Sequence, residues 1–127
     1  MEFRVVLPNG LPGLESMVEC TLSKVDEEGP FYILRENKRD ISIVLTDPRG
    51  LIEDYHIELP KKELEDIELD VEDDAIVLLV TIIGDTPNDF KVNLMAPVII
   101  NHQKGLGKQI VLADVDYPTR YPLFQTT

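Results

Sequence analysis

The hydrophobic and polar positions of this chain alternate in short runs that are typical of a β-rich domain. The first four runs cover residues 3–7, 20–25, 31–35 and 41–45. A turn rich in glycine, proline or charged residues follows each run. This spacing predicts four strands joined as a meander.

The middle of the chain adds one more alternating run, a short helix and a fully apolar strand. Residues 52–59 alternate and predict a strand, with His56 on its more polar face, at the solvent or the sheet margin. Pro60 suits a first helical turn, and Leu64 and Ile67 fall on one side of it, which predicts a helix over residues 60–67. Residues 75–83 are apolar on both faces and predict a buried central strand.

Residues 93–112 predict a β-hairpin. Two apolar runs, 98–100 and 110–112, flank a polar loop that contains Gly105 and Gly107. Pro97 has no N–H to give to a sheet, so we expect the first strand to begin or kink there. Residues 90–94 lead into this hairpin antiparallel to the central strand, and residues 114–127 are expected to wrap the outside.

These elements predict one mostly β domain over residues 1–127, an antiparallel barrel or sandwich with one short helix. The turns are too short for parallel crossovers. A chain of this length buries enough surface to fold without disulfides or metal ions.

Charge narrows the partners that such a domain can take. The chain has 24 acidic and 12 basic residues and a formal net charge of -12. We therefore expect no direct nucleic-acid binding and no membrane binding, whereas a basic partner would be steered toward the chain. Charge that only keeps a small β protein in solution is the alternative.

The acidic residues are densest just after the predicted helix. Residues 65–74 contain seven carboxylates and no basic side chain. They form either a solvated helix end and loop or a docking surface for a protein rich in Lys and Arg.

The chain offers few groups for catalysis. Cys20 stands alone, so we expect no intramolecular disulfide, a reducing compartment and a small buried side chain rather than a reactive thiol. His56 and His102 lack metal-ligand spacing, and nucleophile-elbow and phosphate-loop motifs are missing from the sequence. The longest apolar run is too short to cross a bilayer. These features predict a soluble cytoplasmic protein that is not an enzyme, with no catalytic residue, no cofactor and no metal ion.

Several motifs together resemble one family, the flagellar assembly factor FliW family. In the order expected for that family they are Gly10-Leu11-Pro12-Gly13-Leu14-Glu15, Asp47-Pro48, Tyr55, Asn93-Leu94-Met95-Ala96-Pro97 and Tyr121-Pro122-Leu123. They cover essentially the whole chain, and the segment from Asn93 to Pro97 is the most specific of them.

The resemblance implies a small antiparallel β-barrel that is not an enzyme and that binds two proteins in turn. One is flagellin, through its C-terminal region. The other is the translational repressor CsrA, a basic RNA-binding dimer. A family member that holds CsrA relieves repression of flagellin mRNA, and newly made flagellin takes that member away again. We expect the chain itself to be monomeric.

Two sets of residues are the predicted protein-binding sites. Asn93, Pro97 and Asn101 belong to or follow the most specific motif, and the acidic set consists of Asp70, Glu72, Asp73 and Asp74. The alternative from a different functional class is a ligand-binding barrel or an unrecognised hydrolase that uses His56 and His102.

Overall fold

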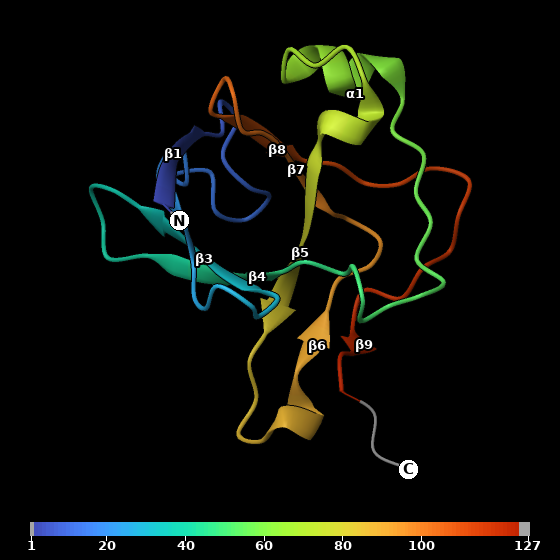
Figure 1. The fold of residues 1–127 in the computed structure, drawn as a ribbon. Helices are drawn as coiled ribbons and strands as arrows, with labels where there is room; N and C mark the ends of the chain where they lie inside the picture. The colour runs from blue at the N-terminus through green and yellow to red at the C-terminus, as the bar shows by residue number, and fades with distance from the viewer. Residues whose placement is uncertain (1, 125–127) are drawn as a thin grey trace.

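The structure is a computed structural model, and it describes residues 2–124 as a β-barrel with a small helical cap (Figure 1). Two 3-10 turns, η1 (Glu72–Asp74) and η2 (Pro87–Asp89), flank the central strand. The other elements, in chain order, are β1 (Glu2–Val6), β2 (Glu19–Lys24), β3 (Phe31–Glu36), β4 (Ser42–Thr46), α1 (Lys61–Asp66), β5 (Ile76–Ile82), β6 (Lys91–Val92), β7 (Val98–Asn101), β8 (Leu106–Gln109) and β9 (Tyr121–Pro122).

The barrel is closed by seven strands. Their order is β4-β3-β2-β1-β8-β7-β5, and β5 pairs back with β4 to complete the ring. Every pairing in the ring is antiparallel except that of β1 with β8, which is parallel and rests on Val6 opposite Leu106. The predicted mostly β barrel with one short helix is confirmed, and the single parallel contact makes it a mixed barrel.

The first four strands lie where the alternation predicts them, to within one residue at most ends. Cys20 and Leu22 of β2, and Leu34 of β3, point into the main core cluster. Glu36 at the end of β3 is 2% exposed, and its carboxylate accepts the backbone N–H groups of Lys38 and Arg39. That buried carboxylate closes the turn between β3 and β4.

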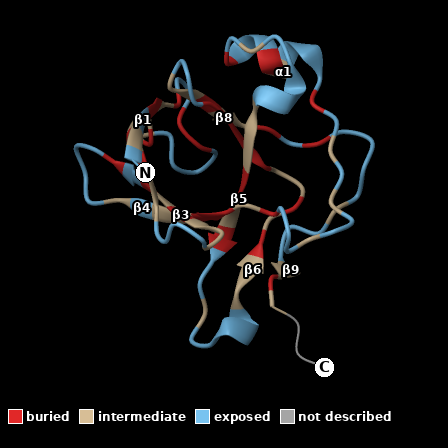
Figure 2. Ribbon diagram, viewed as in Figure 1, coloured by how far each residue is buried: buried red, intermediate tan, exposed pale blue. Residues whose placement is uncertain are grey.

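β5 is buried on both faces because each face meets a different part of the molecule. Leu78 points into the barrel with the main core cluster. Val77 and Leu79 point outward, where residues after β4 and the tail cover them. Figure 2 shows β5 and β7 as largely buried or intermediate, and the helix and hairpin tips as largely exposed. The prediction of a central apolar strand is therefore confirmed.

The segment opposite β5 is divided in two. β6 pairs with the end of β5 and β7 pairs with its start, both antiparallel. Between the two pairings β5 advances three residues, from Leu78 to Thr81, while the opposite chain advances six, from Val92 to Val98. The extra residues form the loop 93–97, and β7 begins directly after Pro97, where the missing N–H removes no ladder bond.

The hairpin prediction is right for its first strand and wrong for its second. β8 covers Leu106–Gln109 instead of residues 110–112, because the turn closes earlier, at Gly105, whose N–H donates to the Asn101 carbonyl at 2.9 Å. Gly107 lies within β8, not in the loop. A Cβ there would lie 2.9 Å from Leu7 Cδ2 and 3.2 Å from the Ile99 carbonyl oxygen, so a larger residue would force its neighbours in the barrel wall to shift.

Residues 52–59 are not a strand, which corrects a second prediction. The alternation itself is real, since Leu59 is buried and Ile57 packs on the cluster beneath the helix. However, this segment pairs with no strand of the described residues, and β4 itself already has β3 on one side and β5 on the other. The segment runs as extended chain over the outward face of the barrel.

The helix and the C-terminal segment complete the cover. α1 lies over one end of the barrel, whereas β6 and β9 lie at the other end (Figure 1). Pro60 is the N-cap of α1, and Leu64 and Ile67 are buried, as predicted. Residues 114–124 wrap the outside and add β9 to the edge of β6, while residues 125–127 of the predicted tail lie outside the described part. None of the helices within residues 2–124 has the length and apolar character needed to span a bilayer.

Cys20 is the buried side chain that the sequence predicts, with 1% of its surface exposed. Burial, and secondarily the charge of Glu36, raises the pKa of its thiol to about 11. A thiol with a raised pKa carries little thiolate near neutral pH, and thiolate is the reactive species.

We therefore predict that Ellman's reagent at pH about 8 leaves native Cys20 unmodified and labels it fully once denaturant unfolds the chain. Because the folded state holds this proton more tightly, stability should fall as the pH rises from about 9 toward 11. A Cys20→Ala variant gives the background for that fall. Rapid labelling of the native protein would contradict the assigned burial.

Candidate functional site

The acidic residues form a continuous exposed segment between α1 and β5, which we call the acidic segment (residues 65–74). All seven of its carboxylates are exposed. Asp66 accepts a hydrogen bond from Lys108 Nζ at 2.8 Å, and this bond together with the lysine's charge lowers the pKa of Asp66. Lys104 Nζ lies 4.0 Å from Glu68 Oε1. Charge neutralisation within the segment is therefore confined to its helical end.

The other end of the acidic segment has a different structural environment. Glu72 Oε1 accepts the backbone N–H of Leu59 at 3.0 Å, which ties η1 to the extended chain after β4. The carboxylates of Asp70, Asp73 and Asp74 form no hydrogen bond or ion pair with any described residue. These charges are exposed and form no ion pair with a side chain of residues 2–124.

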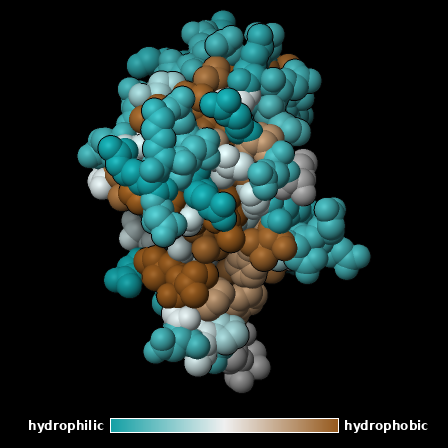
Figure 3. Space-filling model, turned by 90° about the vertical axis from the view of Figure 1, so that its left-hand side faces the viewer, coloured by the Kyte–Doolittle hydropathy of each residue, from teal (hydrophilic) through white to brown (hydrophobic). Residues whose placement is uncertain are grey.

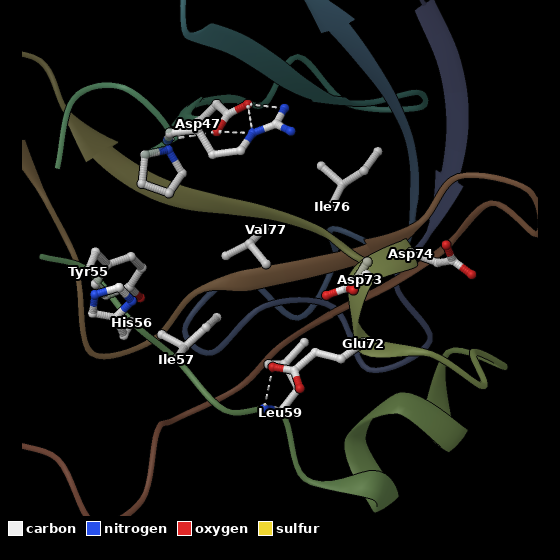
Figure 4. A pocket seen from close by; sticks show the side chains of 13 residues that line it. Asp47, Tyr55, His56, Ile57, Leu59, Glu72, Asp73, Asp74, Ile76 and Val77 are labelled. Atoms are coloured by element: carbon white, nitrogen blue, oxygen red, sulfur yellow. Dashed lines mark hydrogen bonds and ion pairs between the residues drawn. The ribbon is translucent and has the colours of Figure 1, made fainter. Parts of the chain in front are cut away.

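A pocket of about 480 Å³ opens beside η1 (Figure 4). Its apolar floor comes from two neighbouring segments, with Ile57 and Leu59 after β4 and Val77 of β5, and Ile76 lines it at the start of that strand. Its rim is polar and mainly acidic, consisting of Asp47, Arg49, Tyr55, His56, Glu72, Asp73 and Asp74. The pocket thus joins an acidic rim to an apolar floor.

Arg49 is the one cation on this rim, counting His56 as neutral, and it is already paired. Its Nε lies 3.1 Å from both Asp47 carboxylate oxygens and its Nη2 lies 2.7 Å from Asp47 Oδ2. The hydrogen bonds and charge of Asp47 raise the pKa of Arg49. The remaining carboxylates give the pocket a negative field.

Tyr55 supports the far wall of the pocket and does not act as an acid or base near neutral pH. Its hydroxyl donates to the Leu94 carbonyl at 2.7 Å, and its ring packs edge-on against Tyr117. Burial raises the pKa of Tyr55, and so does the neighbouring Tyr117. This family motif residue therefore fastens the chain after β4 to the loop 93–97.

The two histidines lie in separate places. His56 is exposed at the pocket rim, as the sequence analysis predicts. His102 lies in the turn after β7 and stacks on Phe3, with ring centroids 4.1 Å apart. Within residues 2–124 no group of three or more His, Cys, Asp or Glu side chains has the arrangement needed to hold a metal ion.

Asn93 and Pro97 hold the loop 93–97 in shape. Asn93 Oδ1 accepts the N–H groups of Met95 and Ala96, at 3.0 and 3.1 Å. The Pro97 carbonyl accepts the N–H of Ile110 at 3.0 Å, and Pro97 is buried. Asn93 also lines a shallow groove of about 350 Å³ bounded by Leu14 and Val111. A direct partner contact by Asn93 or Pro97 stays a prediction.

Asn101 supports the acidic segment from beneath. It is 3% exposed, and its Nδ2 donates to the carbonyls of Ile67 and Glu68, at 2.9 and 3.2 Å. Glu68 has a positive φ of 60°, a left-handed conformation that costs energy for a residue with a side chain. The Asn101 amide thus holds the turn by which the chain leaves α1.

The structure brings together only part of the predicted site. Glu72, Asp73 and Asp74 lie at one pocket, with Asp70 further along the same segment. Asn101 reaches that segment through its backbone contacts, whereas Asn93 and Pro97 lie in the loop opposite β5. The pocket floor was not predicted as a site, although the alternating apolar residues 57 and 59 marked one of its walls.

The face in Figure 3 is hydrophilic over its upper part, with hydrophobic side chains gathered lower down. Among the described residues, the most exposed large hydrophobic side chains are Val111 at 70%, Val25 at 57% and Val71 at 51%. Exposed apolar side chains by themselves are ordinary on a small domain. The acidic rim and its pocket are therefore the stronger candidate site.

The sequence model of the family described as "FliW protein" matches residues 2–123 of the chain. The chain belongs to the FliW family. It is 38% identical over 122 residues to the flagellar assembly factor FliW of Natranaerobius thermophilus, covering 94% of this chain and 81% of that protein. It is 30% identical over 122 residues to the flagellar assembly factor FliW of Clostridium kluyveri, covering 95% and 84%.

A solved structure of the family has the same fold. The crystal structure of the flagellar assembly factor FliW superimposes with a TM-score of 0.88 at 31% identity, covering 97% of this chain and 86% of that one. The resemblance found in the motifs is thereby confirmed. FliW proteins are flagellar assembly factors and not enzymes, so the chain is a non-enzymatic member of a flagellar assembly family.

We predict that Asn101→Ala lowers the free energy of unfolding by about 1–3 kcal/mol, because the buried Ile67 carbonyl and the part-buried Glu68 carbonyl lose their donor. Urea unfolding followed by circular dichroism measures the change. Asn88→Ala is the matched control, since Asn88 is exposed in η2, and it should alter stability by less than about 0.5 kcal/mol. Equal losses for the two variants would contradict the support role of Asn101.

Proposed function

We propose that this chain is a partner-switching antagonist in flagellar assembly, which holds a CsrA-type repressor and gives it up when flagellin binds. In this scheme the repressor cannot act on flagellin mRNA while the chain holds it. Newly made flagellin removes the chain, and export of flagellin returns it. The chain itself acts as a cytoplasmic monomer without direct contact to nucleic acid or membrane.

The observation that carries the proposal is the unpaired charge of the acidic segment in a member of a flagellar assembly family. The carboxylates of Asp70, Asp73 and Asp74 form no ion pair within residues 2–124, so they remain available to attract a basic partner. Complementary fields speed association and disfavour wrong partners. A protein of net charge -12 seated on an RNA-binding dimer would also repel incoming RNA.

The proposed contacts of the repressor are Asp70, Glu72, Asp73 and Asp74. Glu72 has a double role in this proposal, because its carboxylate also accepts the Leu59 N–H. We keep Asn93, Pro97 and Asn101 as proposed contributors through the shape of the segments they hold. For Asn101 that contribution reaches the acidic segment directly, through Ile67 and Glu68.

The hydrolase or ligand-binding alternative finds little support. His56 lies at the pocket rim, whereas His102 lies in the turn after β7 and stacks on Phe3, and no buried side-chain polar atom of the described residues lacks a hydrogen-bond partner. A double His56→Ala, His102→Ala variant should retain full function in flagellar assembly. Loss of that function with an intact fold would favour the alternative.

We predict that charge reversal of three carboxylates, Asp70→Lys, Asp73→Lys and Asp74→Lys together, weakens repressor binding by at least about tenfold at low salt. Glu72 is left intact so that its bond to Leu59 survives. Isothermal titration with a purified CsrA dimer measures the affinity. Wild-type binding should also weaken as the salt concentration rises, because screening shortens the reach of surface charge to about 8 Å at physiological ionic strength.

The matched control reverses three exposed carboxylates elsewhere, Asp40→Lys, Asp85→Lys and Asp116→Lys, and so changes the net charge equally. It should cost far less affinity than the triple variant in the acidic segment. Excess flagellin should release the repressor from the wild-type chain. A wild-type chain that binds neither partner at low salt would overturn the proposed function.

A further inference from the structure

The carboxylates beside the pocket do not point the same way. In Figure 4 the Asp73 carboxylate points over the apolar floor toward Val77, whereas Asp74 points away from the pocket. Glu72 points toward Leu59, whose N–H it accepts. Asp73 is therefore the carboxylate that projects over the floor without a partner among the described residues.

The floor below Asp73 offers apolar surface to a ligand. Ile57 and Val77 are half-buried and line the pocket, so each keeps part of its side chain accessible, whereas the Ile76 side chain packs against the main core cluster on the opposite face of β5. A purely polar ligand would leave this apolar surface exposed to water. An occupant that covers it with methylene groups would gain roughly 25 cal/mol for each Å² of apolar surface buried.

The charge around the pocket sets the sign of the occupant. Four carboxylates and one guanidinium line it, and that guanidinium is held by Asp47. An anion would meet net repulsion here. A cation on a long apolar stem meets attraction at the rim and apolar surface at the floor, and only Lys and Arg side chains combine the two.

We propose that this pocket, which we call the η1 pocket, takes one long basic side chain of the partner, with its stem on Ile57 and Val77 and its charged head at Asp73. The inference rests on the proposed function, because it names the feature of the basic partner that this site recognises. The general field of the acidic segment steers the partner, and the η1 pocket fixes how it is seated. The two effects are separable by mutation.

Neighbouring residues give the first test. Asp73→Asn and Asp74→Asn remove the same charge from adjacent exposed positions, so the general field loses equally from each. Seating in the η1 pocket predicts that Asp73→Asn weakens binding of the CsrA dimer about tenfold and Asp74→Asn about twofold or less. Equal losses would overturn the inference while leaving the proposed function intact.

The floor gives a second test that does not depend on charge loss. Ile57→Lys would fill the η1 pocket with the chain's own basic side chain, whereas the adjacent Glu58→Lys lies outside the pocket lining. The Glu58 variant changes the net charge by two units and the Ile57 variant by one. A purely electrostatic surface predicts the greater loss for Glu58→Lys, and an occupied pocket predicts the greater loss for Ile57→Lys. Circular dichroism confirms the fold of both variants.

Double-mutant cycles distinguish lysine from arginine as the occupant. Single Lys→Ala and Arg→Ala variants of the CsrA dimer are titrated against the wild-type chain and against Asp73→Asn. The seated residue is the one whose loss costs about tenfold against the wild type and little against Asp73→Asn. If every partner variant costs the same against both chains, the inference fails. If the wild-type chain does not bind the dimer at all, the proposed function itself fails.

Discussion

The structure depends on one strand, β5, which is hydrogen-bonded to other strands along both of its edges and is packed against apolar side chains on both of its faces. Its seven residues pair with β7 and then β6 on one side and with β4 on the other. A strand enclosed in this manner must be apolar on both faces, because polar side chains there would lose water without gaining partners. Thr81 meets the requirement through a hydrogen bond of 2.6 Å between its hydroxyl and that of Thr46.

The loop 93–97 follows from the same constraint. The chain opposite β5 has three more residues than β5 over the same stretch, so these residues form a loop outside the sheet. Their backbone N–H and C=O groups still need hydrogen-bond partners. Asn93 accepts two of the N–H groups, Gln109 Nε2 donates to the Ala96 carbonyl, and Tyr55 donates to the Leu94 carbonyl. The most specific motif of the family therefore has a clear structural role in shaping the barrel.

The acidic segment lies where the chain approaches β5 from outside. A charged side chain inside the barrel wall would lose its hydration without gaining a partner. The carboxylates therefore lie on the exposed residues that precede β5, which begins at Ile76. The same approach places Glu72 and Asp73 above the outward face of β5, next to the extended chain 55–59. The η1 pocket is thus a consequence of how the barrel is closed, and its acidic rim lies on residues that are free to face a partner.

Much of this fold could be predicted from the residues, and the failures have definite physical causes. The strands at the start of the chain, the central strand and the helix could be predicted because the spacing of their apolar residues and the turn residues at their ends indicate the same element. Residues 52–59 carry a strand pattern without strand pairing, and beyond the end of β8 residues 110–112 keep only the bonds of the Ile110 and Leu112 N–H groups to the Pro97 and Met95 carbonyls. The pattern reports which side is buried, whereas pairing depends on whether a free edge lies alongside. The lone parallel contact of β1 with β8 joins distant segments and left no local signal.

The site was predictable in part for a similar reason. The density of carboxylates in residues 65–74 can be counted in the sequence, but their directions cannot. That Asp73 projects over a floor made by Ile57 and Val77 depends on two segments meeting across the barrel wall. Asn101 was predicted as a protein-binding residue; its burial beneath the helix end shows a structural contribution, and a direct partner contact stays a prediction.

Binding of the partner at the η1 pocket is tested most directly by comparing amide hydrogen exchange of the chain alone and of the chain in complex with the CsrA dimer. Protection on binding should concentrate in residues 55–59 and 68–77, which include two sides of the η1 pocket. Protection confined to the groove around Leu14 and Val111, with exchange at residues 55–59 and 68–77 unchanged, would contradict binding at the η1 pocket.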